Sequence, residues 1–197
     1  MTEWEKAQEG YLYDANNDEA ILAARLRCDD LCWEYNQCRP SDLPRRQELL
    51  RRILGEIRGS IVVTAPFYCD YGVNISVGDN FYTNHNCTIL DAAPVKFGDN
   101  VFIAPNCVFS TAGHPIDSEQ RARGLEIALP ITVGSNVWFG ANVSVLPGVT
   151  IGDDVVIGAG SVVNRDIPSG VVAAGCPCRV VRPITEADRY KYPVLGE

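Results

Sequence analysis

Apolar residues recur at every sixth position through residues 131–168. The recurring residue is aliphatic or aromatic in six consecutive units: Val133, Phe139, Val145, Ile151, Ile157 and Val163. A second apolar or small position keeps the same spacing at Val137, Val143, Val149, Val155, Ser161 and Ile167. An amphipathic helix repeats every 3.6 residues and an ordinary strand every second residue, so neither keeps a six-residue phase. The pattern predicts a hexapeptide parallel β-helix, in which each unit contributes one flat strand and one corner.

The corners of this predicted coil are marked by glycine. Glycine directly follows the recurring apolar residue at Gly134, Gly140, Gly152 and Gly158. Because Gly, Asn and Asp tolerate the positive φ that a tight corner can require, we interpret their recurrence as the turning points of the chain.

Upstream, the repeat begins irregularly at Ser60 and slips at 91–94. It is interrupted between Phe109 and Val133, and residues 113–130 carry charge, Gly and Pro without any six-residue phase. A long loop leaving a compact stack is typically functional.

Residues 1–58 have a different character and predict a helical segment. One helix is expected from a cap at Asp18 or Asn17 to about Asn36, and its buried stripe is Ile21, Ala24, Cys28, Leu31, Cys32 and Tyr35. A second helix is expected from a Ser41 cap to Gly59, with Pro44 in its first turn. We expect both helices to cover the first coil of the β-helix. The predicted organisation is a helical segment 1–58, a β-helix 59–182 with the loop 113–130, and a polar tail 183–197.

The composition limits the classes of function. The 197 residues suit one domain. The sequence contains no run of about 20 apolar residues and no apolar signal-peptide core at its start, so we expect a cytoplasmic protein whose eight cysteines are reduced. Cys87 and Cys107 occupy inward repeat positions and are interpreted as core filler, and Cys176 and Cys178 lack partners for a metal motif. A net charge of −8 argues against a nucleic-acid partner.

The sequence contains two histidines, His85 and His114, and both lie outside the inward repeat positions. His114 stands where the long loop departs, between Gly113 and Pro115. An imidazole has an ordinary pKa near ~6.5 and is the natural proton acceptor at neutral pH. We therefore predict that His114 is a catalytic base.

Several stretches together resemble the maltose/galactoside O-acetyltransferases, a branch of the hexapeptide acyltransferases. They are Gly10-Tyr11-Leu12-Tyr13-Asp14, Cys69-Asp70-Tyr71-Gly72, Asn80-Phe81-Tyr82-Thr83-Asn84, Gly113-His114-Pro115, Asn136-Val137-Trp138-Phe139-Gly140 and Ala173-Ala174-Gly175-Cys176-Pro177-Cys178-Arg179-Val180. The resemblance implies a left-handed coil, a homotrimer with active sites between neighbouring subunits, acetyl-CoA as co-substrate and a sugar hydroxyl as acceptor. No bound cofactor and no metal are expected.

The resemblance also assigns roles to residues. His114 would take the proton of the acceptor hydroxyl and return it to the departing thiol. The backbone N–H of Ala141 from a neighbouring subunit would stabilise the oxyanion. Asn84 would hold the acceptor, with Tyr82 and Asp91 lining the same pocket.

For two acidic residues, the sequence leaves more than one role open. Asp14 either grips an acceptor hydroxyl or forms a turn before a helix. Glu126 either orients His114, accepts a hydrogen bond from the sugar, or is a plain surface charge. His85 is expected to be a bystander beside Asn84.

For acetyl-CoA, the resemblance places the pantetheine arm along Trp138, Ala141 and Ala159. Asn164 and Arg165 stand where relatives often carry a Thr-Lys pair, and Arg179 and Arg182 are candidates for the phosphate groups.

Three other functions are compatible with the same repeat. The nearest is acetylation of another small acceptor, such as an antibiotic, serine or an amine. A non-catalytic trimeric scaffold is the second. A zinc-dependent carbonic anhydrase is the third, but such sites use three histidines and this chain has two.

Overall fold

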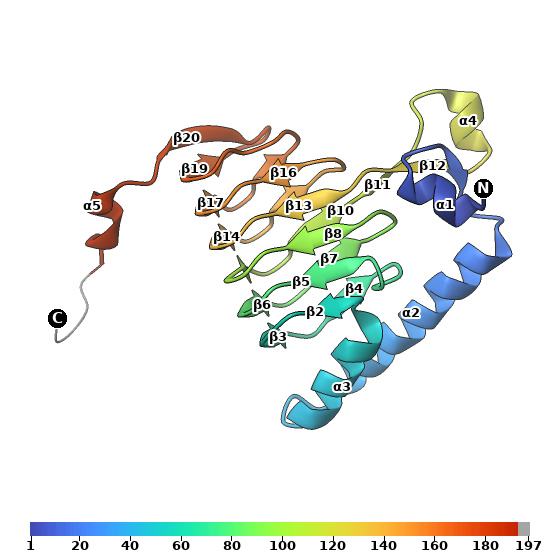
Figure 1. Ribbon diagram of the computed structural model, residues 1–197, viewed down its shortest axis with the longest axis horizontal. Helices are drawn as coiled ribbons and strands as arrows, with labels where there is room; N and C mark the ends of the chain where they lie inside the picture. The colour runs from blue at the N-terminus through green and yellow to red at the C-terminus, as the bar shows by residue number, and fades with distance from the viewer. Residues whose placement is uncertain (193–197) are drawn as a thin grey trace.

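The computed structural model describes residues 1–192, and its main body is a coil of three parallel sheets (Figure 1). Sheet I contains β2 (Glu56–Ile57), β5 (Ile75–Val77), β8 (Val95–Phe97), β13 (Ile131–Val133) and β16 (Thr150–Ile151). Sheet II contains β3 (Ile61–Val63), β6 (Phe81–Thr83), β9 (Phe102–Ile103), β14 (Val137–Phe139), β17 (Val155–Ile157), β19 (Val171–Ala174) and β20 (Arg179–Pro183). Sheet III contains β4 (Phe67–Cys69), β7 (Cys87–Leu90), β10 (Val108–Ser110), β15 (Ser144–Val145) and β18 (Val162–Val163).

The chain visits sheets I, II and III in turn and climbs as a left-handed β-helix of about six turns, which confirms the predicted fold class. The coil has three corners, which we name I–II, II–III and III–I after the sheets that they join. The number of residues per turn is not uniform. The bond between Asn80 and Asn100 of adjacent coils spans 20 residues, whereas the bond between Asn136 and Asp154 spans 18. The two extra residues fall at corner III–I, which includes the predicted slip at 91–94.

Two corners have positive φ at the residue types that the sequence suggested. Corner I–II has positive φ at Asn80, Asn100, Asn136 and Asp154, and corner II–III at Asn86, Asn106, Asn142 and Gly160. Gly134, Gly140, Gly152 and Gly158 do not have positive φ, and these positions instead allow adjacent coils to approach closely. A Cβ at Gly134 would lie 2.8 Å from the backbone of Gly152 in the next coil, and one at Gly140 would lie 2.6 Å from the nitrogen of Ala159. The prediction of Asn and Asp as corner residues is confirmed, and these four glycines are close-contact positions.

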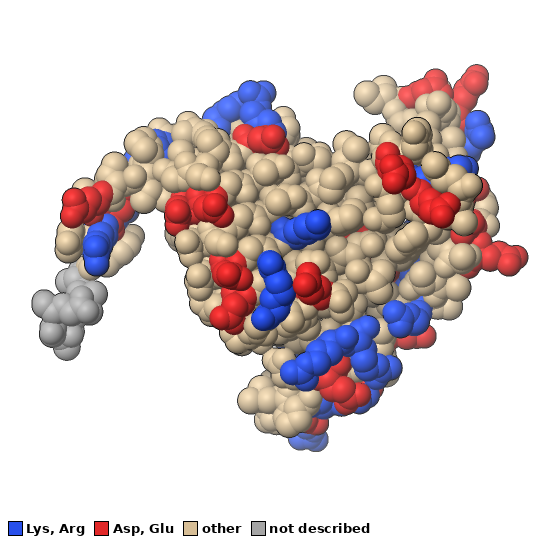
Figure 2. All heavy atoms as spheres, in the orientation of Figure 1, with Lys and Arg blue, Asp and Glu red and all other residues tan. Residues whose placement is uncertain are grey.

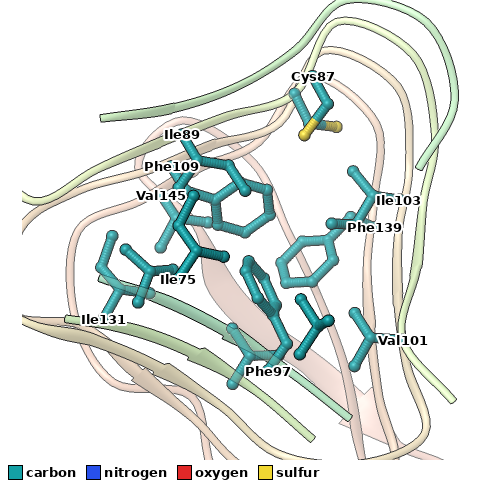
Figure 3. Close-up of a cluster of buried hydrophobic side chains, with 14 of the residues drawn as sticks. Ile75, Cys87, Ile89, Phe97, Val101, Ile103, Phe109, Ile131, Phe139 and Val145 are labelled. Atoms are coloured by element: carbon teal, nitrogen blue, oxygen red, sulfur yellow. The ribbon is translucent and has the colours of Figure 1, made fainter. Parts of the chain in front are cut away.

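The interior of the coil is filled by the recurring apolar positions. Phe81, Phe97, Phe109 and Phe139 form an aromatic ladder with successive ring centroids 5.1 Å apart. Figure 3 shows Phe97, Phe109 and Phe139 meeting inside the triangle, with Cys87 near a corner. Cys87 and Cys107 are both fully buried, as their repeat positions indicated. This continuous core holds the corners at fixed positions relative to one another.

The helices α2 (Glu19–Gln37) and α3 (Leu43–Ile53) lie against the first coil (Figure 1). Asp18 caps α2 as predicted. Two boundaries differ from the prediction: Asp42, not Ser41, caps α3, and α3 ends at Ile53 because the chain enters β2 at Glu56. The β-helix thus begins before residue 59. Leu49, Leu50 and Ile53 join the same core as the coil.

The excursion 113–130 is an ordered hairpin, with strands β11 (Ala112–Gly113) and β12 (Leu125–Ala128) separated by α4 (Ser118–Ala122). Strand β1 (Tyr13–Asp14) pairs with the outer edge of β12, giving the sheet order β1-β12-β11. Helix α1 (Glu3–Gln8), absent from the sequence prediction, packs here through a small second core that includes Ala7, Tyr13 and Tyr71. The N-terminus therefore holds the loop against corner III–I.

At the other end of the coil, β20 reverses direction and pairs antiparallel with β19, and α5 (Glu186–Arg189) follows. The predicted tail 183–197 begins within β20, and its residues 193–197 lie outside the described residues. Figure 2 shows positive and negative side chains interspersed over the visible face, most densely on the helical segment. In the part of the chain that the structure describes, none of the helices has the length and apolar character of a membrane span.

Candidate active site

His114 is held by the hairpin at the point where β11 ends. Its Nδ1 lies 3.0 Å from the carbonyl oxygen of Leu125 on β12. A carbonyl only accepts, so Nδ1 carries a proton, and Nε2 is the nitrogen that can act as a base. The side chain is half-exposed. The hairpin therefore fixes the orientation of the ring and leaves Nε2 outside that hydrogen bond.

Glu126 lies on the Nε2 side of this imidazole. Its Oε1 is 3.9 Å from His114 Nε2, and its Oε2 accepts a hydrogen bond from the Tyr13 hydroxyl at 2.9 Å. Burial, followed by the charge of Glu126, raises the pKa of Tyr13, so the phenol remains a donor. The carboxylate is placed to stabilise an imidazolium, while the Leu125 carbonyl, rather than Glu126, orients the ring.

A cavity of about 400 Å³ opens in front of His114. Its lining is Arg25, Asp70, Leu90, Ser110, Ala112, Gly113, His114 and Glu126. The volume is in the range of small-molecule sites. One basic nitrogen, two carboxylates, a guanidinium and a hydroxyl converge there, which is a lining suited to a small polar ligand with several hydroxyl groups.

Arg25 of α2 spans this cavity and the second core. It donates to the Tyr71 hydroxyl at 3.0 Å and lies over the Tyr71 ring, 5.7 Å from the centroid. Its Nε is buried and has no hydrogen-bond partner among the described residues. A buried donor without a partner is costly, so the placement of this guanidinium is stabilised by its Tyr71 contacts rather than by Nε.

Asp70 is the second charged residue that the structure adds to the site. Burial, then the nearby Asp91, raises the pKa of Asp70 to about 6, and Arg25 acts in the opposite direction. The carboxyl group can therefore both donate and accept hydrogen bonds near neutral pH.

Two residues predicted to bind the acceptor have structural roles. Asp91 is fully buried, and its carboxylate accepts from the backbone N–H groups of Tyr71 and Asn74 at 2.9 and 3.3 Å. It supports the wall behind the cavity and is not among the residues that line it, so the predicted contact between Asp91 and the acceptor stays without support from this geometry. The Asp14 carboxylate accepts from the N–H groups of Asn16 and Asn17, which is the turn-forming alternative.

Asn84, Ala141 and Ala159 lie together at corner II–III, away from His114 at corner III–I. Ala141 and Ala159 are each the second residue after their strands β14 and β17, so they are equivalent in adjacent coils, whereas Asn84 directly follows β6 and aligns with Gly140 and Gly158. Within residues 1–192 the Ala141 N–H donates no hydrogen bond, whereas the Gly140 N–H before it donates to Ile157. This corner therefore combines small side chains with a backbone donor that no described residue uses.

Tyr82 and Trp138 belong to an apolar stripe on the outer face of sheet II. The strand register aligns Val62, Tyr82, Phe102, Trp138, Val156 and Val172 across six coils. Trp138 is 53% exposed and Val62 is 57% exposed. The corresponding outer row of sheet I is mostly polar: Glu56, Ser76, Lys96, Thr132 and Thr150. An exposed apolar row of this length marks a binding surface.

The residues predicted to bind the phosphates of acetyl-CoA lie at the C-terminal end of the coil, where the stripe ends at Val172. Arg182 is aligned with Val172, but it makes a two-pronged ion pair with Asp188 at 2.6 and 2.7 Å. Arg179 donates to the Asn164 side chain at 3.2 Å, and Arg165 is exposed. Arg165 and Arg179 are thus better available to a ligand than Arg182.

The two histidines do not form a shared site. His85 lies at corner II–III with its Nδ1 against the Ala65 carbonyl, and His114 lies at corner III–I. The zinc alternative gains no support from their placement.

The chain is similar to known proteins in both sequence and fold. Residues 6–59 match the maltose acetyltransferase hexapeptide capping motif, and residues 130–165 match the bacterial transferase hexapeptide of six repeats. The galactoside O-acetyltransferase of Escherichia coli K12 is 47% identical over 88% of this chain and 86% of its own length. The chain belongs to the maltose/galactoside O-acetyltransferase family.

Solved structures agree with this membership. A maltose O-acetyltransferase from Clostridium difficile 630 is 46% identical with a TM-score of 0.91, over 94% of this chain and 99% of that protein. A galactoside acetyltransferase in complex with coenzyme A is 44% identical with a TM-score of 0.94, over 98% and 96% of the two chains. As a family member, this protein is an acyltransferase, which confirms the resemblance seen in the sequence.

Arg25 and Asp70 are the cavity residues that sequence reasoning missed. In the sequence, Arg25 lies off the apolar stripe of its helix, a position typical of a solvated side chain. The packing of α2 under corner III–I places it in the cavity lining instead. Asp70 stands in a stretch that carries the family resemblance, so a closer look at Cys69-Asp70-Tyr71-Gly72 could have found it.

Proposed function

We propose that this protein transfers the acetyl group of acetyl-CoA to a hydroxyl of a sugar such as maltose, glucose or a galactoside. The observation that carries the proposal is the hydrogen bond from His114 Nδ1 to the Leu125 carbonyl, which orients the ring so that Nε2 is the nitrogen left to act as a base beside a polar cavity. The family relationship supports the choice of acyl donor, because the related galactoside acetyltransferase was solved in complex with coenzyme A.

His114 Nε2 takes the proton of the acceptor hydroxyl as its oxygen attacks the thioester carbon. A sugar hydroxyl is a weak nucleophile, so removing the proton during attack lowers the barrier. The resulting imidazolium lies 3.9 Å from the Glu126 carboxylate, which stabilises it until the proton passes to the departing thiolate.

The acceptor is held by the charged lining of the cavity. Hydroxyl groups both donate and accept, and Arg25, Asp70 and Ser110 supply complementary partners. This lining favours a polar acceptor such as a sugar over an apolar amine.

The rest of the site comes from a second copy of the chain. Within one chain, Asn84 and Ala141 lie at a different corner from His114. In a homotrimer, the apolar stripe of sheet II packs between copies and brings corner II–III of one to corner III–I of the next. Asn84 would then hold the acceptor, and the free Ala141 N–H would stabilise the tetrahedral oxyanion.

Acetyl-CoA would lie along corner II–III, with its pantetheine arm beside Trp138, Ala141 and Ala159. Arg165 and Arg179, with Asn164, would hold the phosphate groups at the end of the coil. A non-catalytic trimer would bury the same stripe, but it would have no use for a polar cavity in front of an oriented imidazole.

The test is an acetyl-CoA consumption screen over sugars, nucleosides, amino acids, amines and antibiotics. The expected result is His114-dependent release of free thiol with sugars, with O-acetyl sugar recovered as product. Turnover confined to an amine or an antibiotic would replace the acceptor. No turnover with any compound, together with no binding of acetyl-CoA, would favour the scaffold.

A further inference from the structure

Three cysteines meet beneath the first coil, on the far side of β4 from the solvent. Cys28 and Cys32 are one turn apart on α2, so their side chains share a face of the helix. Cys69 ends β4, the first strand of sheet III, against which α2 packs. The three side chains are at most 4% exposed and carry free thiols.

The sulfur atoms have the spacing of a metal-ligand set. Cys69 Sγ lies 3.5 Å from Cys28 Sγ and 3.7 Å from Cys32 Sγ, and all three sulfurs fall within 4.8 Å of one another. Three sulfurs at about 2.3 Å from one ion would lie about 3.8–4.0 Å apart, in tetrahedral or trigonal arrangement respectively. The two measured separations from Cys69 need adjustments of only a few tenths of an ångström to reach this spacing.

The ligand set points to a soft ion. Thiolates select Cu(I) and Zn(II) among biological metals, whereas Mg²⁺ and Ca²⁺ require oxygen ligands. Among the described residues, the cluster contains three ligand atoms and no fourth His, Cys, Asp or Glu. Structural zinc sites are almost always four-coordinate, so a closed three-sulfur site favours Cu(I).

Ion binding would be coupled to proton release. Thiolates are the ligands of a soft ion, so an incoming ion would displace protons from the cysteines. Affinity should therefore weaken as pH falls.

We propose that Cys28, Cys32 and Cys69 form a binding site for a single soft metal ion, with Cu(I) preferred to Zn(II). The site is independent of the acetyl-transfer chemistry. It joins the helical segment to the coil, so a bound ion would fasten α2 to β4 and raise the thermal stability of the folded protein.

The experiment is an anaerobic titration of the reduced, full-length protein with Cu(I) against a copper chelator, and in parallel with Zn(II). Wild type should retain one ion per chain after desalting, with Cys28, Cys32 and Cys69 protected from alkylation. Cys69→Ser should lose that ion, with at least a hundredfold weaker binding. Cys107→Ser is the matched control, because it removes a buried thiol outside the cluster, and it should retain the ion.

Thermal unfolding separates binding from misfolding. Cu(I) should raise the Tm of wild type and Cys107→Ser but not of Cys69→Ser, and Cys28→Ser should repeat that loss if Cys69→Ser folds poorly. Retention of Zn(II) in the same cysteine-dependent way would support the site and change the ion. Equal retention of both ions by wild type and the cluster variants would overturn the proposal.

Discussion

Corners II–III and III–I of the same coil differ in how they are built. Corner II–III is regular: it repeats positive-φ asparagines at Asn86, Asn106 and Asn142, and small residues stack beside them. Corner III–I has extra residues in its lower coils and the hairpin 113–130 above them. It is held by long-range contacts, including the buried carboxylate of Asp91.

The difference suggests a division of labour. A regular corner gives a straight groove with backbone donors in register, which suits an extended ligand such as the pantetheine arm. An irregular corner can enclose a cavity and orient a single imidazole, which suits the reacting hydroxyl. If the proposed trimer forms, each active site joins one corner of each kind.

Removing the imidazole should have the largest effect on turnover. His114→Ala should lower kcat by ~10²–10⁴-fold, the usual contribution of a general base. His85→Ala, at the other corner, should remain within a few-fold of wild type. Steady-state kinetics with acetyl-CoA and the preferred sugar measures both, and an active His114→Ala protein would remove this residue from the mechanism.

Mixed trimers test whether the two corners belong to one site. Asn84→Ala and His114→Ala should each have low activity alone. Co-refolded in equal amounts, they should recover about a quarter of wild-type activity, because a random site has an even chance of receiving each intact residue. No recovery, with mixed trimers verified by mass, would place both residues within a single chain.

The hydrogen bonds that support corner III–I can be removed by substituting the buried Asp91. Asp91→Ala leaves the Tyr71 and Asn74 N–H groups without an acceptor, and it should lower the free energy of unfolding by about 2–4 kcal/mol. The exposed Asp99 accepts from the Asp79 N–H at corner I–II, and Asp99→Ala should cost under about 1 kcal/mol. Urea unfolding of the two variants measures both changes. Equal losses in the free energy of unfolding would contradict the proposed difference between corners III–I and I–II.

The proposed acetyl-CoA site at corner II–III can be tested by measuring the KM for acetyl-CoA. Trp138→Ala should raise the KM for acetyl-CoA about tenfold, or about 1.4 kcal/mol, with little change in the KM for the sugar. Lys96→Ala, on the outer row of sheet I, should change neither value. Sedimentation should show that the variants keep the wild-type assembly, and equal shifts in both KM values for Trp138→Ala would exclude a donor-specific role.

The last prediction concerns the pH dependence of stability contributed by Asp70. Its pKa is raised from 3.8 to about 6 in the folded chain, so the folded state binds more protons than the unfolded state between these values. The stability that it contributes is therefore lost as pH rises from about 4 to about 6, and is level above that.

Asp70→Asn should remove this dependence. The urea midpoint of the variant, relative to wild type, should rise across the same pH interval. Parallel curves for the two proteins would show that Asp70 titrates normally in the folded state.

The periodic parts of this protein could be predicted in detail. The six-residue phase placed the strands of residues 131–167 and the inward residues, because each unit of a β-helix contacts only the units directly beside it. Asp18 was recognised as a cap because capping is a local interaction. The position of His114, between Gly113 and Pro115 at the mouth of a loop, was enough to nominate it as a base.

The sequence by itself thus determined the coil, its core and the excursion, which follow from short-range spacing, and it nominated His114 as the base. Only the tertiary structure decided that Arg25 and Asp70 line the cavity, that Asp91 is buried behind it, and that Cys69 meets Cys28 and Cys32. These contacts join segments between 17 and 46 residues apart. Packing of α2 and β1 against corner III–I brings them together, and that packing leaves no periodic trace along the chain.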